Sequence, residues 1–388
     1  MAIRWRILLL LFLSRMVMAF QFATIGAIAP RLGSELHLDA VAIGTLIGVY
    51  SAPGIIVAIP GGAIANWLGD KKVVLIGLAL MAVGSALLAI STSWELQISG
   101  RLIAGIGGIT LNVVMSKMVL DWFAGKEIAT AMAVFVNSWP AGIAVALVLQ
   151  PLVVGSSGIA SAFALEAAVA ILAFAAMFAF YRAPDHVTTG ATKPKRFPSG
   201  LVLFATLAAG IVWGLFNGAL AVVFSFMPSL LVEDGWSLAQ AGASTSLVMV
   251  GVMLAGFAGG VLSDRTGRPM TILLVATLVF AALLFVIPRF GGNLATILAI
   301  GVSAGLTVGP ILTLPAAVLD APSRATGMGV FYMIYYICFS AAPWISGKVI
   351  EASNVARVFD FAVAMALLSL AFAWLCRIIT ARHKVTLG

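Results

Sequence analysis

Charged side chains are scarce in this sequence: Asp, Glu, Lys and Arg together make up 9% of its 388 residues. Reactive and metal-binding side chains are scarce too, with two cysteines and three histidines. His37, His186 and His383 lie in predicted loops or tails without ligand spacing, and Cys338 and Cys376 lie in apolar segments without a disulfide pattern. The sequence therefore indicates neither an enzyme nor a metal site, and we expect no cofactor.

Long polar stretches are rare as well. Hydrophobic residues make up 62% of the chain, and the mean hydropathy is +1.14. A soluble domain of this length could not bury so much apolar surface, whereas a helix of ~20 apolar residues crosses a hydrocarbon core of ~30 Å. We therefore expect an all-α integral membrane protein with twelve transmembrane helices. The predicted spans are 8–29, 40–64, 72–92, 97–120, 129–151, 159–181, 200–226, 239–262, 270–288, 293–317, 326–347 and 356–378.

The basic residues are distributed unevenly between the two sides of these spans. Fifteen lie at one predicted side: Arg4, Arg6, Lys71, Lys72, Lys126, Arg182, Lys193, Lys195, Arg196, Arg265, Arg268, Arg324, Arg377, Arg382 and Lys384. The other side has Arg31, Arg289, Lys348 and Arg357, and the spans contain Arg15, Arg101 and Lys117. By the positive-inside rule we expect a multi-pass protein of the cell inner membrane with both termini in the cytoplasm. The net charge of +8 then reports topology, and its spread over separate loops predicts no nucleic-acid partner.

A polar segment rich in Pro, Gly and Thr, residues 182–200, divides the chain near its middle. We expect a six-helix bundle over residues 1–182, a cytoplasmic linker over 183–199 and a second bundle over 200–388. The two halves match at an offset of 198 residues. The matching pairs are Pro30 and Pro228, Leu32 and Leu230, Glu35 and Glu233, Gly44 and Gly242, and Gly69 and Gly267. Such parallel repeats predict two halves related by an axis along the membrane normal.

The repeat includes two similar loops, GGAIANWLGDKK at 61–72 and GGVLSDRTGRP at 259–269. Both resemble the loop signature of the major facilitator superfamily, and RLIAGIGG at 101–108 resembles that family's Arg-x-x-x-Gly-x-Gly signature. The resemblance covers essentially the whole chain. It implies two pseudo-symmetric six-helix bundles and secondary transport of a small solute by alternating access.

The resemblance assigns the loops a gating role, as a latch that favours the outward-open state. A carboxylate at one helix end can bond the free N–H groups of a neighbouring helix, and cations can hold it there. The second copy is nearly complete, and the first has Asn66 and Trp67 in place of the acidic residue and the arginine. The predicted gating residues are Asp264, Arg265, Gly267 and Arg268, with Asn66, Gly69, Asp70 and Lys71 in the first copy. Alternatively, Arg265 and Arg268 only determine topology.

Small and polar residues form one stripe on the fourth span: Arg101, Gly105, Gly108, Asn112 and Ser116. Such a face lines a cavity or packs on a neighbouring helix. We expect packing for the two glycines and a substrate-binding role for Arg101 and Asn112. Glu166, deep in the sixth span, either pairs with a cation or carries a proton, and both alternatives stay open.

Other polar and aromatic side chains lie near the middle of their spans, where the substrate of such a repeat protein binds between the halves. The candidates are Gln21, Asn137, Trp139, Trp213, Asn217, Tyr332, Tyr335 and Tyr336. Packing is the alternative for each aromatic residue. Arg15 is a further candidate, although it lies opposite Gln21 around the helix, so both cannot face the cavity. Its alternative is to extend toward the cytoplasmic surface.

The charges within the spans favour an anionic or polar neutral substrate, since Arg15, Arg101 and Lys117 outnumber Glu166. The segment LNVVMSKMVLDWF, residues 111–123, resembles the cyanate permease and nitrate/nitrite porter branches, which favours a small anion. WPAG at 139–142 resembles a signature of drug/proton antiporters, so drug or metabolite efflux is an alternative, and a channel or facilitative pore is another. We expect a monomer in the lipid bilayer, with protons as a candidate coupling ion.

Overall fold

The computed structural model describes residues 3–58, 68–124, 127–184, 197–316, 318–319 and 323–387. Within these ranges the regular secondary structure is entirely helical, and twelve helices are long and apolar enough to cross a membrane. Each predicted span overlaps one of them. The predicted all-α fold with twelve transmembrane helices is therefore confirmed.

The first half comprises six spans, two of which are interrupted by short breaks. Its helices are α1 (Ile3–Ala27), α2 (Ala29–Leu36), α3 (Ala40–Ser51), α4 (Pro53–Val57), α6 (Asp70–Ile90), α7 (Trp94–Trp122), α8 (Ile128–Val136), α9 (Ser138–Ser157) and α10 (Ile159–Phe180). The breaks fall between α3 and α4 and between α8 and α9. Pro53 and Pro140 follow them, and proline cannot donate the backbone hydrogen bond that would continue the helix.

The second half comprises six helices, each of which forms one span: α11 (Gly200–Glu233), α12 (Leu238–Thr266), α13 (Pro269–Phe290), α14 (Leu294–Ala316), α15 (Arg324–Ala352) and α16 (Val355–Leu387). Its local structure repeats that of the first half at the 198-residue offset. Asp39 caps α3 and Ser237 caps α12, each through its side-chain oxygen. Gly69 and Gly267 both have positive φ, at 85° and 62°, where a glycine is favoured.

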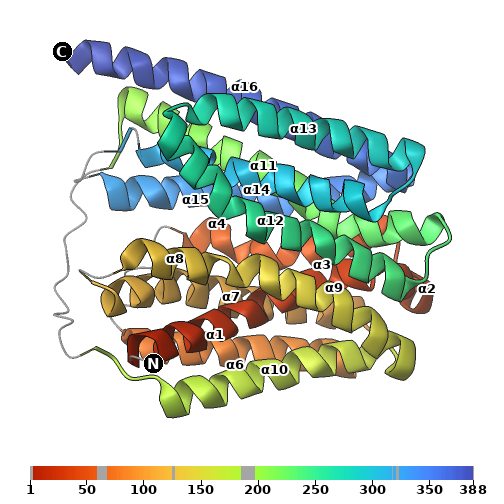
Figure 1. Cartoon of the computed structure of the whole chain (residues 1–388). Helices are drawn as coiled ribbons and strands as arrows, with labels where there is room; N and C mark the ends of the chain where they lie inside the picture. Colours follow the sequence, from red (N-terminus) through yellow and green to blue (C-terminus); the bar gives the residue numbers. More distant parts are fainter. Residues whose placement is uncertain are drawn as a thin grey trace.

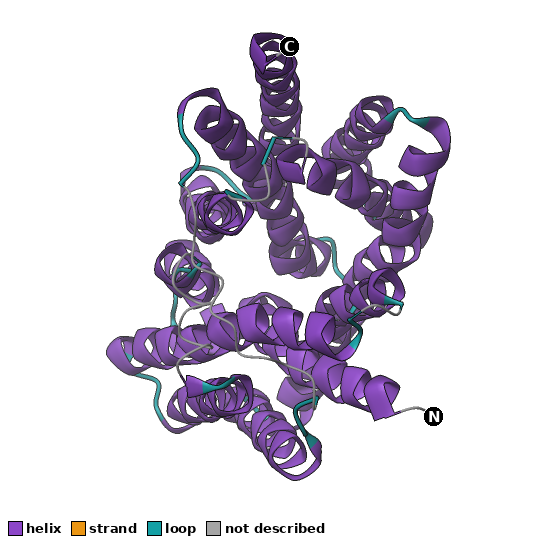
Figure 2. Ribbon diagram, turned by 90° about the vertical axis from the view of Figure 1, so that its left-hand side faces the viewer, coloured by secondary structure: helices purple, strands orange, loops and turns teal. Residues whose placement is uncertain are grey.

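The two halves form two bundles that lie side by side (Figure 1). Both chain termini lie at one end of the molecule, here called the terminal end, and Figure 2 looks along the helices from it. α10 ends at Phe180 and α11 begins at Gly200. The exact boundaries of the two bundles and of the linker stay a prediction.

The halves meet through α15 against α3 and α4, α12 against α9, and α11 against α1 and α2. At the end opposite the termini, here called the opposite end, glycines allow backbones to touch. A methyl group added at Gly44 would overlap the backbone of Pro343, and one added at Gly347 would overlap that of Ala40. Nearer the middle, the hydroxyls of Ser51 and Ser340 share a hydrogen bond of 2.8 Å. The halves are therefore closely packed from the opposite end inward, as small residues allow in membrane helices.

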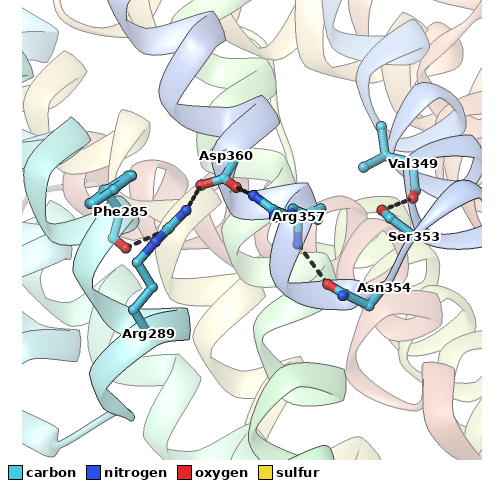
Figure 3. A network of polar contacts seen from close by, with 7 residues as sticks. All are labelled: Phe285, Arg289, Val349, Ser353, Asn354, Arg357 and Asp360. Atoms are coloured by element: carbon cyan, nitrogen blue, oxygen red, sulfur yellow. Dashed lines mark hydrogen bonds and ion pairs between the residues drawn. The ribbon is translucent and has the colours of Figure 1, made fainter.

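An ion-pair network holds the opposite end of the second half (Figure 3). Arg289 at the end of α13 and Arg357 in α16 both contact Asp360, at 2.8 and 3.0 Å. Arg289 also donates to the carbonyl of Phe285 at 2.7 Å. These groups are partly exposed, so each pair contributes ~1 kcal/mol or less. The network joins α13 to α16 and does not involve the first half.

Candidate functional site

Arg15 lies in the middle of α1 and is half-buried. Its Nε donates to Oδ1 of Asn112 in α7 at 2.6 Å. Its Nη1 donates to the carbonyls of Phe135 and Val136 at 3.1 and 3.0 Å, and to the hydroxyl of Ser138 at 3.1 Å. The guanidinium thus joins α1 to α7 and to the break between α8 and α9. This geometry argues against the alternative in which Arg15 extends to the membrane surface.

The break between α8 and α9 explains how these carbonyls become available. Pro140 has no N–H to donate to the carbonyl of Val136, four residues earlier. An unpaired backbone carbonyl is expensive at membrane depth, and Arg15 supplies the missing donor. Pro140, which frees the carbonyl of Val136, and the side-chain amide of Asn112 therefore fix the position of Arg15.

One part of the Arg15 guanidinium stays open. Arginine has five N–H donors in a planar fork, and the hydrogen bonds formed with the described residues use only Nε and Nη1. Nη2 has no partner among the described residues and is not fully enclosed, so it is accessible. No carboxylate of the described part forms an ion pair with Arg15. The cation is therefore held in place but not neutralised.

Three tyrosines of the second half face Arg15 from α15. Tyr332, Tyr335 and Tyr336 are all close enough to interact with its charge. Tyr336 is buried and also contacts the side chain of Asn112, whereas Tyr332 is 38% exposed. The structure thus brings together five predicted substrate-binding residues, Arg15 and Asn112 from the first half and the three tyrosines from the second.

A row of aromatic rings connects the two halves beside this cluster. Trp139 of α9 lies 5.5 Å from Phe22 of α1, measured between ring centroids. Phe22 stacks on Phe339 at 5.1 Å, and Phe339 stacks on Tyr335 at 5.2 Å. Tyr335 lies 6.2 Å from Trp213 of α11. The two predicted tryptophans therefore stand at opposite ends of one aromatic row.

Arg101 has a different environment from Arg15. It is fully buried, and its Nε, Nη1 and Nη2 donate to the carbonyls of Leu46, Gln21 and Phe22 at 2.9, 2.8 and 3.4 Å. Its guanidinium also lies 4.5 Å above the ring of Tyr50. Because all three nitrogens bond to backbone carbonyls inside the first half, the geometry argues for a structural role and against the expected substrate contact.

Gln21 and Glu166 belong to the same interior network. The amide of Gln21 donates to the hydroxyl of Ser85 at 2.9 Å, and that hydroxyl donates to Glu166 at 2.8 Å. Glu166 is fully buried and interacts electrostatically with Arg101. Gln21 therefore faces the interior of its own half, while Arg15 faces the other half, in agreement with their opposite positions on α1.

Asn137 and Asn217 are half-buried and bond within their own helices. The amide of Asn137 donates to the carbonyl of Ala133 at 3.2 Å, and that of Asn217 to the carbonyl of Trp213 at 2.9 Å. Among the described residues neither side chain bonds to Arg15. Their substrate-binding role stays a prediction without support from these contacts.

Lys117 was counted among the cations within spans, and the structure revises its contribution. It lies toward the terminal end of α7 and forms ion pairs with Asp70 at 2.7 Å and Asp121 at 3.4 Å. Its side chain is 37% exposed. Two carboxylates compensate this lysine, so it adds no positive charge to the region around Arg15.

The other first-copy gating residues lie in the same region. Lys71 donates to the carbonyls of Phe178 and Tyr181 at 2.8 and 3.0 Å, at the end of α10. Burial raises the pKa of Tyr181, just after α10, to about 12. Asp70 and Lys71 therefore connect α6 to α7 and α10 within the first half. Asn66 lies outside the described residues.

The second copy is exposed at the terminal end of α12. Asp264, Arg265 and Arg268 are exposed, and Gly267 ends the helix in the left-handed conformation, with its N–H bonded to the carbonyl of Ser263 at 3.0 Å. Within the described ranges, the charged side chains of this copy form no hydrogen bond or ion pair. A latch that includes them stays a prediction.

The family is established by comparison with known proteins. The model of the Major Facilitator Superfamily matches residues 11–343. The chain belongs to this superfamily. The cyanate transport protein CynX of Escherichia coli (strain K12) is 25% identical over 358 residues, which cover 88% of each chain. The 4-hydroxybenzoate transporter PcaK of Pseudomonas aeruginosa is 25% identical over 303 residues, 68% of this chain and 66% of that protein.

The fold comparison agrees. An inward-facing, unoccupied structure of a bacterial homologue of the human lysosomal transporter Spinster superposes with a TM-score of 0.78 over 98% of each chain, at 17% identity. The predicted superfamily and fold are confirmed, and the chain is a multi-pass membrane transporter of small solutes. The family and its relatives are transporters, which points away from an enzyme.

Several site residues were missed from the sequence. Phe22 and Phe339 complete the aromatic row but look like ordinary apolar residues of apolar helices. The carbonyl of Val136 had a readable signal, because Pro140 necessarily leaves it without its helical donor. The WPAG segment that suggested efflux therefore has a local structural role here, which is to free a carbonyl for Arg15.

Proposed function

We propose that this chain is a secondary active transporter that binds a small anion at Arg15, between the halves, and moves it across the inner membrane by alternating access. The observation that carries the proposal is the guanidinium of Arg15, held at membrane depth with Nη2 open and no ion-pair partner among the described residues. An arginine in this position is costly unless it is paired or used.

The charge balance around Arg15 supports an anion. Arg101 has Glu166 as a counter-charge, and Lys117 has Asp70 and Asp121. Arg15 is then the one cation among the three within predicted spans that keeps an uncompensated charge. The named substrates of the two relatives, cyanate and 4-hydroxybenzoate, are anions and support the same sign.

The contacts between the halves support an alternating-access cycle. If both termini are cytoplasmic, as the basic residues predict, the close packing at the opposite end corresponds to an inward-facing state. The charged loop at Asp264 and Arg265 would then form its latch only in the outward-facing state. We propose proton coupling through Glu166 as part of the same cycle.

Counterflow in proteoliposomes tests the anion site. The wild type should exchange labelled anion saturably, and Arg15→Gln should lower the apparent affinity by about 10- to 100-fold, since hydrogen bonds to charged groups contribute ~1.5–3 kcal/mol. Arg15→Lys should recover part of the loss, because it restores the charge without the planar fork. Lys348→Gln, at an exposed cation of the opposite end, is the control of equal charge change and should behave as wild type.

Three results would contradict this function. Conductance without saturation would indicate a channel. Competition by organic cations but not by anions would indicate drug efflux. Normal anion affinity in Arg15→Gln would place the binding site elsewhere.

A further inference from the structure

We propose that the Arg15 site selects aromatic monocarboxylates. This inference rests on the proposed function, in which Arg15 binds an anion, and it specifies the rest of that ligand. Three features carry it: the aromatic walls, the open polar groups and the single uncompensated charge.

Aromatic rings from both halves lie beside Arg15. Trp139 from the first half and Trp213 and Tyr335 from the second are partly exposed, and Tyr332 is exposed. Phe22 and Phe339 are buried between Trp139 and Tyr335 in this row, and they fix it by stacking at 5.1 Å. Rings that are partly exposed but held by buried rings present fixed π surfaces, on which a flat aromatic ligand stacks in offset or edge-to-face geometry.

The open polar groups are placed for a carboxylate. Nη2 of Arg15 is a free double donor, and the hydroxyls of Tyr332 and Tyr335 have no hydrogen-bond partner among the described residues. Both tyrosines interact with the charge of Arg15. A carboxylate bonded to Nη2 therefore has phenolic donors beside it, while its ring extends toward the aromatic row.

The single charge limits the ligand to a monoanion. A second carboxylate would be buried without a cation, because Arg101 already has Glu166 and is enclosed by backbone carbonyls. A small linear ion such as cyanate would occupy only the polar groups and leave the aromatic walls without contact. A ligand with one carboxylate and one ring fits both parts.

Matched ligands test the inference on the purified full-length protein by isothermal titration. Benzoate should bind about three- to tenfold more tightly than cyclohexanecarboxylate, which has the same carboxylate and a similar size without a π system. Benzoate should also bind at least tenfold more tightly than terephthalate, which adds a second carboxylate. Acetate and cyanate report binding to the cation alone.

Substitutions in the aromatic row test whether its tryptophans cause the preference for benzoate. Trp213→Leu should reduce the benzoate to cyclohexanecarboxylate ratio toward one, and Trp139→Leu provides the same test from the other half. Trp374→Leu, a tryptophan of α16 that is 57% exposed, is the matched control and should keep the ratio. Melting temperatures without ligand identify any variant that fails to fold. If one tryptophan variant fails, the ratio measured in the other tests the inference.

The outcomes separate the two proposals. If acetate or cyanate binds in an Arg15-dependent manner but benzoate has no advantage over cyclohexanecarboxylate, this inference is wrong and the anion transporter stands. If the wild-type protein bound none of these anions, both the anion-transporter proposal and this inference would be overturned. A wild-type ratio in both tryptophan variants would also overturn the inference, because the preference would arise outside the aromatic row.

Discussion

Arg15 and Arg101 are both arginines in apolar helices of the first half, and their surroundings give them different properties. Arg101 donates through all three nitrogens to backbone carbonyls. Arg15 keeps Nη2 free and faces the tyrosines of the other half. The same side chain thus crosslinks backbone carbonyls in one position, and in the other it has the free donor that we propose binds the ligand.

Glu166 provides a test at the residue scale. Glu166→Gln should abolish the response of uptake to an imposed proton gradient while anion counterflow continues, because an amide can still accept the hydrogen bond of Ser85 but does not carry a proton. Uptake with and without the gradient measures this. Glu95→Gln, at an exposed carboxylate of α7, is the control.

An unchanged gradient response in Glu166→Gln would show that this carboxylate is only the counter-charge of Arg101. The sequence left these alternatives open, and it also could not tell which arginine faces the other half. Spacing shows that Arg15 and Gln21 lie on opposite faces of α1, but lipid and protein interior are both apolar. Periodicity therefore does not indicate which of the two faces points toward the other half.

At the scale of elements, the break between α8 and α9 determines the position of the cation. Pro140 leaves the carbonyl of Val136 free, and Arg15 bonds to it at 3.0 Å. The sequence predicted this span as one continuous helix over 129–151. Hydropathy detects the length of a span, whereas a break depends on whether another side chain satisfies the freed carbonyl, and that partner comes from a distant helix.

Pro140→Ala tests this role of the break. The new N–H at position 140 can bond to the carbonyl of Val136, so Arg15 loses one acceptor and becomes less fixed. We expect anion affinity to fall by about fivefold, equivalent to ~1 kcal/mol for one hydrogen bond, with an unchanged or higher melting temperature. Titration with benzoate and with cyanate measures the affinity.

Pro151→Ala, in the same span but near the opposite end, is the matched control for Pro140→Ala and should leave affinity unchanged. Equal affinities in both variants would mean that Asn112, Ser138 and the carbonyl of Phe135 position Arg15 without the carbonyl of Val136.

At the scale of the whole molecule, the packing of the opposite end rests on backbone contacts at glycines. Gly44→Leu should prevent α3 from approaching Pro343 and shift the population toward a state open at that end. A Ser225→Cys reporter, buried against Gly26 between the halves, should then react faster with a membrane-impermeant thiol reagent, in a background where Cys338 and Cys376 are replaced by serine.

Gly155→Leu is the control for Gly44→Leu, since a methyl group added at Gly155 meets nothing within 4 Å. Equal labelling rates in the two variants would contradict the role of this packing. The repeat itself was readable from the sequence, because Gly44 and Gly242 match at the offset. The surfaces they contact were not, since the sequence does not show which helices of the two halves adjoin.

The cation of the site and most of its aromatic wall belong to different halves of the molecule. Arg15 is attached to the first half through α7 and the break after α8, while the tyrosines and Trp213 belong to α15 and α11. In the proposed site, a bound ligand would therefore contact both halves and form a removable part of the interface between them. Its arrival would add adhesion between two bodies that must rock against each other, and its departure would remove it. A ligand that fitted only one half would be held without promoting movement, so the division of the site between the halves would itself distinguish a substrate from an inhibitor.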